Sequence, residues 1–183
     1  MISSETLNPL ILSAFSGKIT WLEASTKYPL DEFIETFYHT RQRVQENLQG
    51  LTDAQMAFAS EAHSLWSISE SVTHLVYTQG YYLNKLLDIS TSQLPHIVEA
   101  ARGFGEGARQ NIRADELRKS LLFATEQIEV AIDATRNSHD PAKTDDGPFG
   151  VCTYKTWVAL MLSHEIDHLR QIVAMRRQAR TST

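Results

Sequence analysis

Apolar residues recur every three to four positions in four segments of the chain, the period of a helix with one buried face. These helices are expected at about 31 to 48, within 63 to 90, at about 115 to 135, and from near 153 to about 177. Asp31 can cap the first helix and Gly50 can stop it, while Ser67 or Ser69 can cap the second. Alternating strand patterns are scarce, so we predict an all-α protein, most simply a four-helix bundle.

The remaining segments predict additions to this bundle within a single domain. Residues 1–28 are expected to form a helical arm, and residues 29–183 the bundle itself, because apolar residues near the N-terminus need cover: Leu10, Ile11, Phe15, Ile19 and Leu22. The connections 90–113 and 137–151 are both long. We expect a short helix around 97 to 102 in the former, and a polar connection rich in turn-forming residues in the latter.

The connection 90–113 also carries Gly103, Gly105 and Gly107, a spacing that superficially resembles a phosphate-binding loop. No strand precedes these glycines, which makes a phosphate site a weak interpretation. A flexible lid over a site is a better use of them, and an idle surface loop is a third.

Charge and cysteine content narrow the class of protein. The formal net charge of -5 argues against a general nucleic-acid binder, and the arginines near the C-terminus suit the dipole at the end of a helix. One cysteine cannot form an internal disulfide, and the N-terminal segment lacks the basic region of a secretory signal. No apolar run approaches the roughly 20 residues that cross a bilayer. We therefore expect a cytoplasmic protein with neither a nucleic-acid nor a membrane partner.

The stretch LMLSHEIDHLRQI, residues 160–172, carries His-Glu-x-x-His, a metal-binding pattern on a helix. On a helical wheel His164 and His168 lie about 40° apart, on the same face as Gln171. Two imidazoles make a weak site, and zinc normally takes a third protein ligand. The alternative is that both histidines lie on the helix surface or form hydrogen bonds in the core without a metal.

The position of the third ligand excludes a zinc protease of the usual kind. Such a protease takes its third ligand downstream of the motif, yet no Glu, Asp, His or Cys follows His168. The third ligand must come from upstream, where the candidate imidazoles are His39, His63, His74, His96 and His139.

Two further features of the last helix bear on its packing. Apolar residues fill more than half of its circumference, so it needs cover on two sides. The N-terminal arm or a second subunit can supply that cover, and we expect a homodimer.

Cys152 stands near the start of this helix, where a thiol pKa can fall. It lies about 18 Å along the helix from His164, so we expect a packed residue and no ligand.

Two motifs resemble the DinB-like superfamily of four-helix-bundle metalloenzymes: WSISESVTHL (66–75) and HEIDHLRQI (164–172). LQGLTDAQM (48–56) is similar to the family's turn after the first helix, and the resemblance covers about residues 31–175. The chain departs from it at Leu169–Arg170, where many members carry Arg-Gly. The resemblance implies that His74, His164 and His168 bind one divalent ion, zinc or nickel being the most compatible with imidazole.

The resemblance also implies a function, because characterised relatives include transferases and isomerases that use low-molecular-weight thiols. We expect a metal-dependent transferase that acts on a small-molecule substrate and uses such a thiol. A metal-dependent hydrolase is the alternative reaction. A non-catalytic metal-binding module for stress response or interaction is an alternative class, and a purely structural bundle with incidental histidines is the last.

Four polar residues near the ligands have candidate roles. Glu165 points about 100° away from His164 on the wheel, and either acts as a catalytic base from the edge of the site or stays solvated. Tyr81, Glu70 and Asp167 are candidates for orienting the ligands through a second hydrogen bond.

Overall fold

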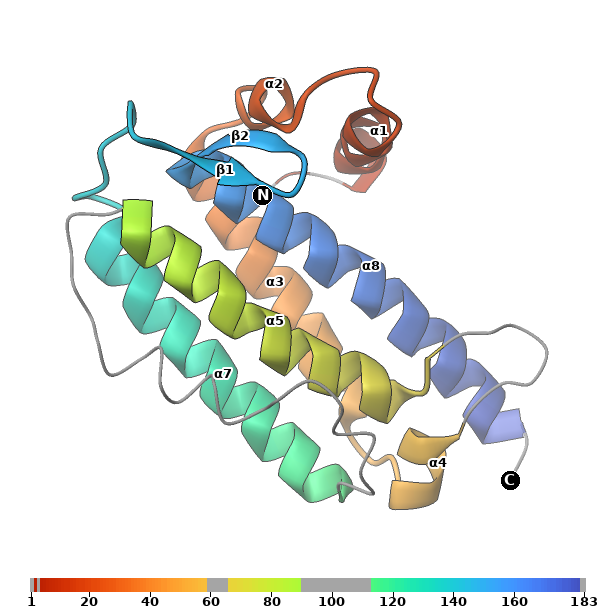
Figure 1. Cartoon of the computed structure of the whole chain (residues 1–183). Coiled ribbons are helices and arrows are strands. Elements are labelled where there is room, and N and C mark those ends of the chain that lie inside the picture. The colour runs from red at the N-terminus through yellow and green to blue at the C-terminus, as the bar shows by residue number, and fades with distance from the viewer. Residues whose placement is uncertain (1, 3, 59–65, 90–112, 182–183) are drawn as a thin grey trace.

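The computed structural model describes the chain except residues 1, 3, 59–65, 90–112 and 182–183. It confirms the all-α prediction, with four long helices packed as a bundle (Figure 1): α3 (Leu30–Leu48), α5 (Ile68–Ile89), α7 (Ala114–Thr135) and α8 (Tyr154–Thr181). α8 packs against α3 and α5, and α7 completes the ring by packing against the same two helices. The seam between α5 and α8 is therefore opposite the seam between α3 and α7.

Local signals set the helix ends. Ser67 precedes α5 and forms a capping box with Glu70, in which each side chain accepts a hydrogen bond from the other residue's backbone N–H. Gly50 follows α3 with a φ of 71°, a left-handed conformation that glycine adopts without a steric cost. Thr153 caps α8, because its hydroxyl accepts from the backbone N–H of Thr156 at 3.3 Å.

The N-terminal arm is helical, as predicted. Its helices α1 (Ser4–Phe15) and α2 (Trp21–Ser25) lie across one end of the bundle, while α4 (Asp53–Ala57) lies near the other end (Figure 1). Ile11 and Trp21 are buried in the same core cluster as Val158 of α8. The arm therefore supplies part of the cover that α8 needs. The homodimer stays a prediction, because the structure describes one chain.

A β-hairpin that the sequence pattern did not predict begins in the connection 137–151 and ends at Thr153. β1 (Thr144–Gly147) pairs antiparallel with β2 (Gly150–Thr153). Their sequences lack the alternation of a half-buried strand, so the hairpin depends on tertiary contacts: Asp145 forms an ion pair with Lys85 of α5, and Cys152 is buried. The expected short helix at 97–102 and the three spaced glycines lie outside the described residues.

The arginines of α8 do more than complement the dipole of their own helix. Arg176 donates hydrogen bonds to the carbonyls of Glu46 and Gln49, at 3.0 and 3.3 Å, and so caps the C-terminus of α3. Arg170 donates to the side-chain oxygen of Asn8 in the arm at 2.6 Å.

Among the described helices, none combines the length and apolar character that a bilayer-spanning segment requires.

A polar layer divides the core of the bundle into two apolar clusters. The cluster at the arm end has residues from every bundle helix, among them Phe37, Leu83, Ile128 and Leu162. The cluster at the other end likewise includes Val44, Val76, Leu121 and Leu169. Between these levels one buried polar side chain from each helix takes part in a hydrogen-bonded group around Arg41: Arg41, Gln79, Thr125 and Glu165. We call these four residues the polar layer.

Arg41 is the centre of the polar layer. Its Nε and Nη2 donate to the two carboxylate oxygens of Glu165 at 2.6 and 2.7 Å, and its Nη1 donates to Oε1 of Gln79 at 2.8 Å. Nη1 also lies 3.4 Å from the Thr125 hydroxyl, and Gln79 donates to the carbonyl of Ala124. The side chains of Arg41 and Glu165 are each 2% exposed. A single guanidinium thus connects all four helices.

Removing one member of this buried pair should destabilise the fold strongly. We expect Arg41→Met to lower the free energy of unfolding by about 3–5 kcal/mol, because it leaves the Glu165 carboxylate buried without a counter-charge. Urea denaturation of the metal-free protein measures this. Arg43→Met is the matched control two residues along the same helix: Arg43 is exposed, and its loss should cost less than about 0.5 kcal/mol. Equal costs for the two variants would contradict the prediction.

Candidate metal centre

The three histidines that the sequence singled out lie together at the seam between α5 and α8. His74 comes from α5, and His164 and His168 come from successive turns of α8. Their ring centroids are 4.6 to 5.1 Å apart, and one candidate ligand nitrogen from each ring lies within 4.8 Å of the other two. Two histidines 90 positions apart, His74 and His164, therefore lie close enough to share one ion.

The donor set fits a divalent metal ion. Nε2 of His74 and Nε2 of His164 are 3.1 Å apart, and a tetrahedral ion with bonds of about 2.0–2.1 Å needs nitrogens separated by about 3.4 Å. His168 is 5% exposed, and its buried Nδ1 has no hydrogen-bond partner among the described residues. A buried ring nitrogen without a protein partner is costly, and a cation bound at that nitrogen would remove the cost.

Burial also keeps two of the rings neutral, as a metal ligand must be. Desolvation, assisted by the neighbouring His168, His74 and Arg41, lowers the pKa of His164 to about 3. Desolvation and the neighbouring His74 lower the pKa of His168 to about 4, against a smaller opposing effect of Gln171. Protons therefore do not compete for these two rings near pH 7.

The sequence profile of the DinB superfamily matches residues 36–172 of this chain, which includes all three histidines. The chain belongs to the DinB superfamily. The match confirms the resemblance carried by the motifs around His74 and around His164 and His168. No curated protein matches the chain.

Aromatic side chains surround this DinB histidine cluster. Trp66 stacks on His168, with ring centroids 5.7 Å apart, and meets His74 edge-on at 4.8 Å. It remains 43% exposed, so part of its ring is open to solvent beside the cluster. On the opposite side Tyr82 lies 5.8 Å from His164. Burial, followed by neighbouring Tyr81, raises the pKa of Tyr82 well above the ordinary value, so its phenol stays neutral.

Of the other candidate imidazoles, the two in the described part of the chain, His39 and His139, are not in the cluster. His39 is exposed on α3. His139 stacks on Tyr154 with ring centroids 4.4 Å apart, and its Nδ1 lies 2.8 Å from the carbonyl of Arg136. His63 and His96 lie outside the described residues.

The structure changes the interpretation of Glu165. It is 1% exposed, so the expectation that it stays solvated is wrong. Both carboxylate oxygens accept from Arg41, which the sequence reasoning did not identify. Arg41 did carry a local signal, because this charged residue occupies an apolar stripe between Phe37 and Val44. The catalytic role of Glu165 stays a prediction.

The three residues expected to orient the ligands have other contacts in the structure. Glu70 belongs to the capping box of α5. Asp167 accepts a hydrogen bond from Gln171 at 3.3 Å. Tyr81 is 45% exposed and packs edge-on against Trp157 with ring centroids 5.7 Å apart. Their role as orienting residues stays a prediction.

Cys152 is a packed residue whose surroundings disfavour the thiolate that a nucleophile needs. Its side chain is buried, and desolvation, together with nearby Asp145, raises the pKa of the thiol to about 11. The expected packing is confirmed, whereas the lowered pKa that a helix start can produce is not found. Burial outweighs the helix dipole here, because the apolar surroundings penalise the thiolate.

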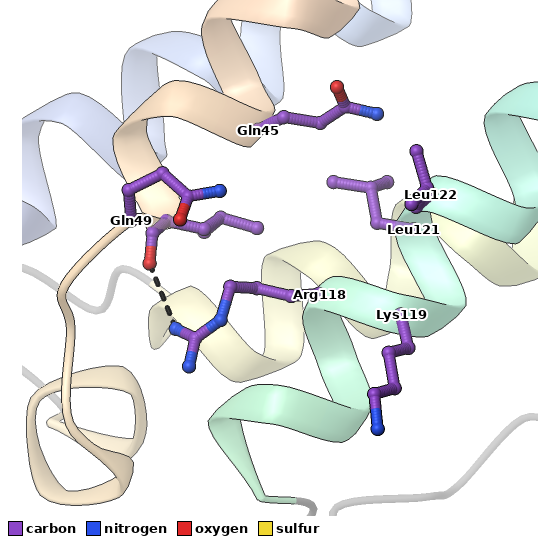
Figure 2. A pocket seen from close by; sticks show the side chains of 7 residues that line it. Gln45, Gln49, Arg118, Lys119, Leu121 and Leu122 are labelled. Atoms are coloured by element: carbon purple, nitrogen blue, oxygen red, sulfur yellow. Dashed lines mark hydrogen bonds between the residues drawn. The ribbon is translucent and has the colours of Figure 1, made fainter.

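A cavity of about 170 Å³ lies at the opposite seam, between α3 and α7. Figure 2 shows its lining, which is formed by Gln45, Leu48, Gln49, Arg118, Lys119, Leu121 and Leu122. The Arg118 guanidinium binds the C-terminal end of α3, because its Nη1 donates hydrogen bonds to the carbonyls of Leu48 and Leu51 at 3.0 and 3.2 Å. No histidine of the cluster lines this cavity, so it is separate from the candidate metal centre.

The lowered histidine pKa values predict a pH dependence of stability for the metal-free protein. In the unfolded chain an imidazole titrates near pH 6.5, whereas His164 and His168 in the fold titrate near 3 and 4. Between these values the unfolded state binds more protons, so stability falls as the pH falls. We expect the free energy of unfolding in EDTA to decrease below about pH 6.5, by up to about 1.4 kcal/mol per pH unit for each imidazole.

The variants that check this dependence are matched histidine substitutions. His164→Gln combined with His168→Gln should flatten the decrease between about pH 6.5 and 5, while exposed His39→Gln should leave it unchanged. Urea midpoints measured across this range decide the matter. A His164→Gln and His168→Gln double variant that keeps the wild-type slope would show that these two rings are not held neutral by the fold.

Proposed function

We propose that this DinB-superfamily protein is a divalent-metal-dependent enzyme in which His74, His164 and His168 hold one ion. The observation that carries the proposal is the convergence of three imidazoles from two helices, with one candidate ligand nitrogen of each within 4.8 Å of the others. Zinc and nickel are the favoured ions, because both accept imidazole ligands. Three protein ligands are typical of a catalytic site, which keeps a position open for water or substrate.

The proposed reaction is transfer to or from a low-molecular-weight thiol. A divalent ion on three neutral imidazoles would lower the pKa of a bound water or thiol. The protein's own contribution is a site with a dry side and an exposed side: Tyr82 packs beside His164, and Trp66 offers an exposed ring beside His168. A small organic substrate can pack on that ring. The family resemblance favours a thiol over water as the nucleophile.

Two alternatives follow from the same histidines. A metal-dependent hydrolase would use water in place of the thiol. A non-catalytic metal-binding module would bind the ion without turnover. Thermal stabilisation by metal does not separate an enzyme from such a module, because any ligand of the native state stabilises it. Turnover by the metal-loaded protein does.

Metal content tests the ligand set directly. We expect about one divalent ion per chain in protein purified without a histidine tag, and a loss of that ion in His74→Ala, His164→Ala and His168→Ala. His39→Ala on α3 is the control, because this histidine is exposed and outside the cluster. Elemental analysis after dialysis measures the content. Unchanged metal in the His164 and His168 variants would overturn the assignment.

The role of Glu165 is tested by the rate of the metal-loaded protein. General acid–base assistance is commonly worth about 10²- to 10⁴-fold. We expect Glu165→Gln to cost less than about 100-fold at full metal occupancy, because both oxygens of Glu165 already accept from Arg41. Turnover of a panel of thiol-transfer substrates measures this. A loss of about a thousand-fold at full occupancy would make Glu165 a catalytic base and favour the hydrolase.

A further inference from the structure

Glu165 and Gln79 stand on the same two helices as the candidate ligands. Glu165 directly follows His164 on α8, and Gln79 lies five positions beyond His74 on α5. Both accept hydrogen bonds from one guanidinium, that of Arg41 on α3. The relative axial position of α5 and α8 is therefore held by a third helix that contributes no histidine to the cluster.

Apolar packing alone fixes this axial position weakly. Above and below the polar layer all four helices present apolar residues at matching levels, and a hydrophobic core tolerates exchanges of similar shape and volume. A one-turn offset of α5 along α8 would move His74 by about 5.4 Å relative to His164. The same offset would separate Gln79 from Arg41 and leave buried polar groups unpaired, which is costly.

We propose that Arg41, through Glu165 and Gln79, is the positioning residue of the metal centre: it fixes the offset between α5 and α8 that brings His74 to His164 and His168. This inference rests on the proposed function. Arg41 touches neither the ion nor the substrate in this role. Positioning partners of this kind commonly change metal affinity by about 10- to 100-fold.

The deciding variant is Arg41→Met combined with Glu165→Met. It removes both charges at once, so neither stays buried without a partner, and replacing a buried pair by apolar residues of similar volume is often neutral for stability. We expect the double variant to fold, yet to bind zinc or nickel about 10- to 100-fold more weakly than the wild type. Its cobalt-loaded form should also show a changed visible absorption spectrum, which reports coordination geometry.

The control is Thr135→Val, which removes another buried hydrogen bond of α8. The Thr135 hydroxyl lies 2.7 Å from the hydroxyl of Tyr154 and connects α8 to α7, which like α3 contributes no candidate ligand. We expect wild-type metal affinity and an unchanged cobalt spectrum in this variant. Equal losses in Thr135→Val and in the double variant would overturn the proposal, because any buried polar contact would then have the same effect.

A metal-free measurement separates this inference from the proposed function. In EDTA, nuclear Overhauser effects between the ring protons of His74 and His164 should be present in the wild type, where the Nε2 atoms are 3.1 Å apart. They should weaken in the double variant. A wild type that binds no metal would overturn the proposed function, while these ring contacts would still decide the positioning role.

Gln79→Met provides a second route if the double variant does not fold. It removes the link from Arg41 to α5 and leaves the pair with Glu165 in place. We expect a loss of metal affinity of about tenfold and weaker ring contacts between His74 and His164. Wild-type affinity and unchanged ring contacts in Gln79→Met, or in a folded double variant, would overturn the positioning role.

Discussion

The buried pair of Arg41 and Glu165 is the contact on which the rest of this structure depends. Removing both charges from water costs several kcal/mol for each, and their attraction offsets that cost only when the remaining donors also find partners. Gln79 and Thr125 supply those partners from the other two helices. All four helices must therefore meet at one level, a requirement that the two apolar clusters on either side do not impose.

Because of this requirement, the glutamate and the two histidines of the His-Glu-x-x-His motif lie on two different faces of α8. Successive helical residues are about 100° apart, so Glu165 points to the core while His164 lies at the seam with α5. His168, one turn later, returns to the same seam. In a metalloprotease the Glu of this motif is a general base. In this chain its oxygens accept hydrogen bonds from Arg41, so the motif contributes to packing and also brings two histidines to one seam.

The sequence predicted features whose signal lies within one segment of the chain, and it missed contacts between distant segments. Helical periodicity located the four bundle helices, because the pattern of a buried face repeats within each segment. His164 and His168 share one helix, so their spacing alone indicated a common ion. His74 required the family resemblance, because no local signal tells which face of α5 meets α8. Periodicity alone placed this residue on a polar stripe away from the centre of the apolar face.

The contact between Arg41 and Glu165 joins residues 124 positions apart, whereas the spacing of residues along the chain predicts only contacts within one helix or strand. Its trace in the sequence was a charge inside an apolar stripe, which is costly unless a partner is buried beside it. The hairpin was missed for a related reason. Its strands have no alternating pattern of their own, and they are held by the ion pair with Lys85 and the burial of Cys152.

The pairing of Glu165 also sets the charge of the metal centre. Two of the candidate ligands are neutral because burial lowers their pKa, and the candidate set contains no carboxylate. A carboxylate directly after His164 would offset the charge of a bound cation, but the guanidinium of Arg41 compensates it at 2.6 Å. On the proposed function a bound cation would then keep its full charge toward the open position. That charge would stabilise an anionic nucleophile, and a thiolate would need no further base once it is formed.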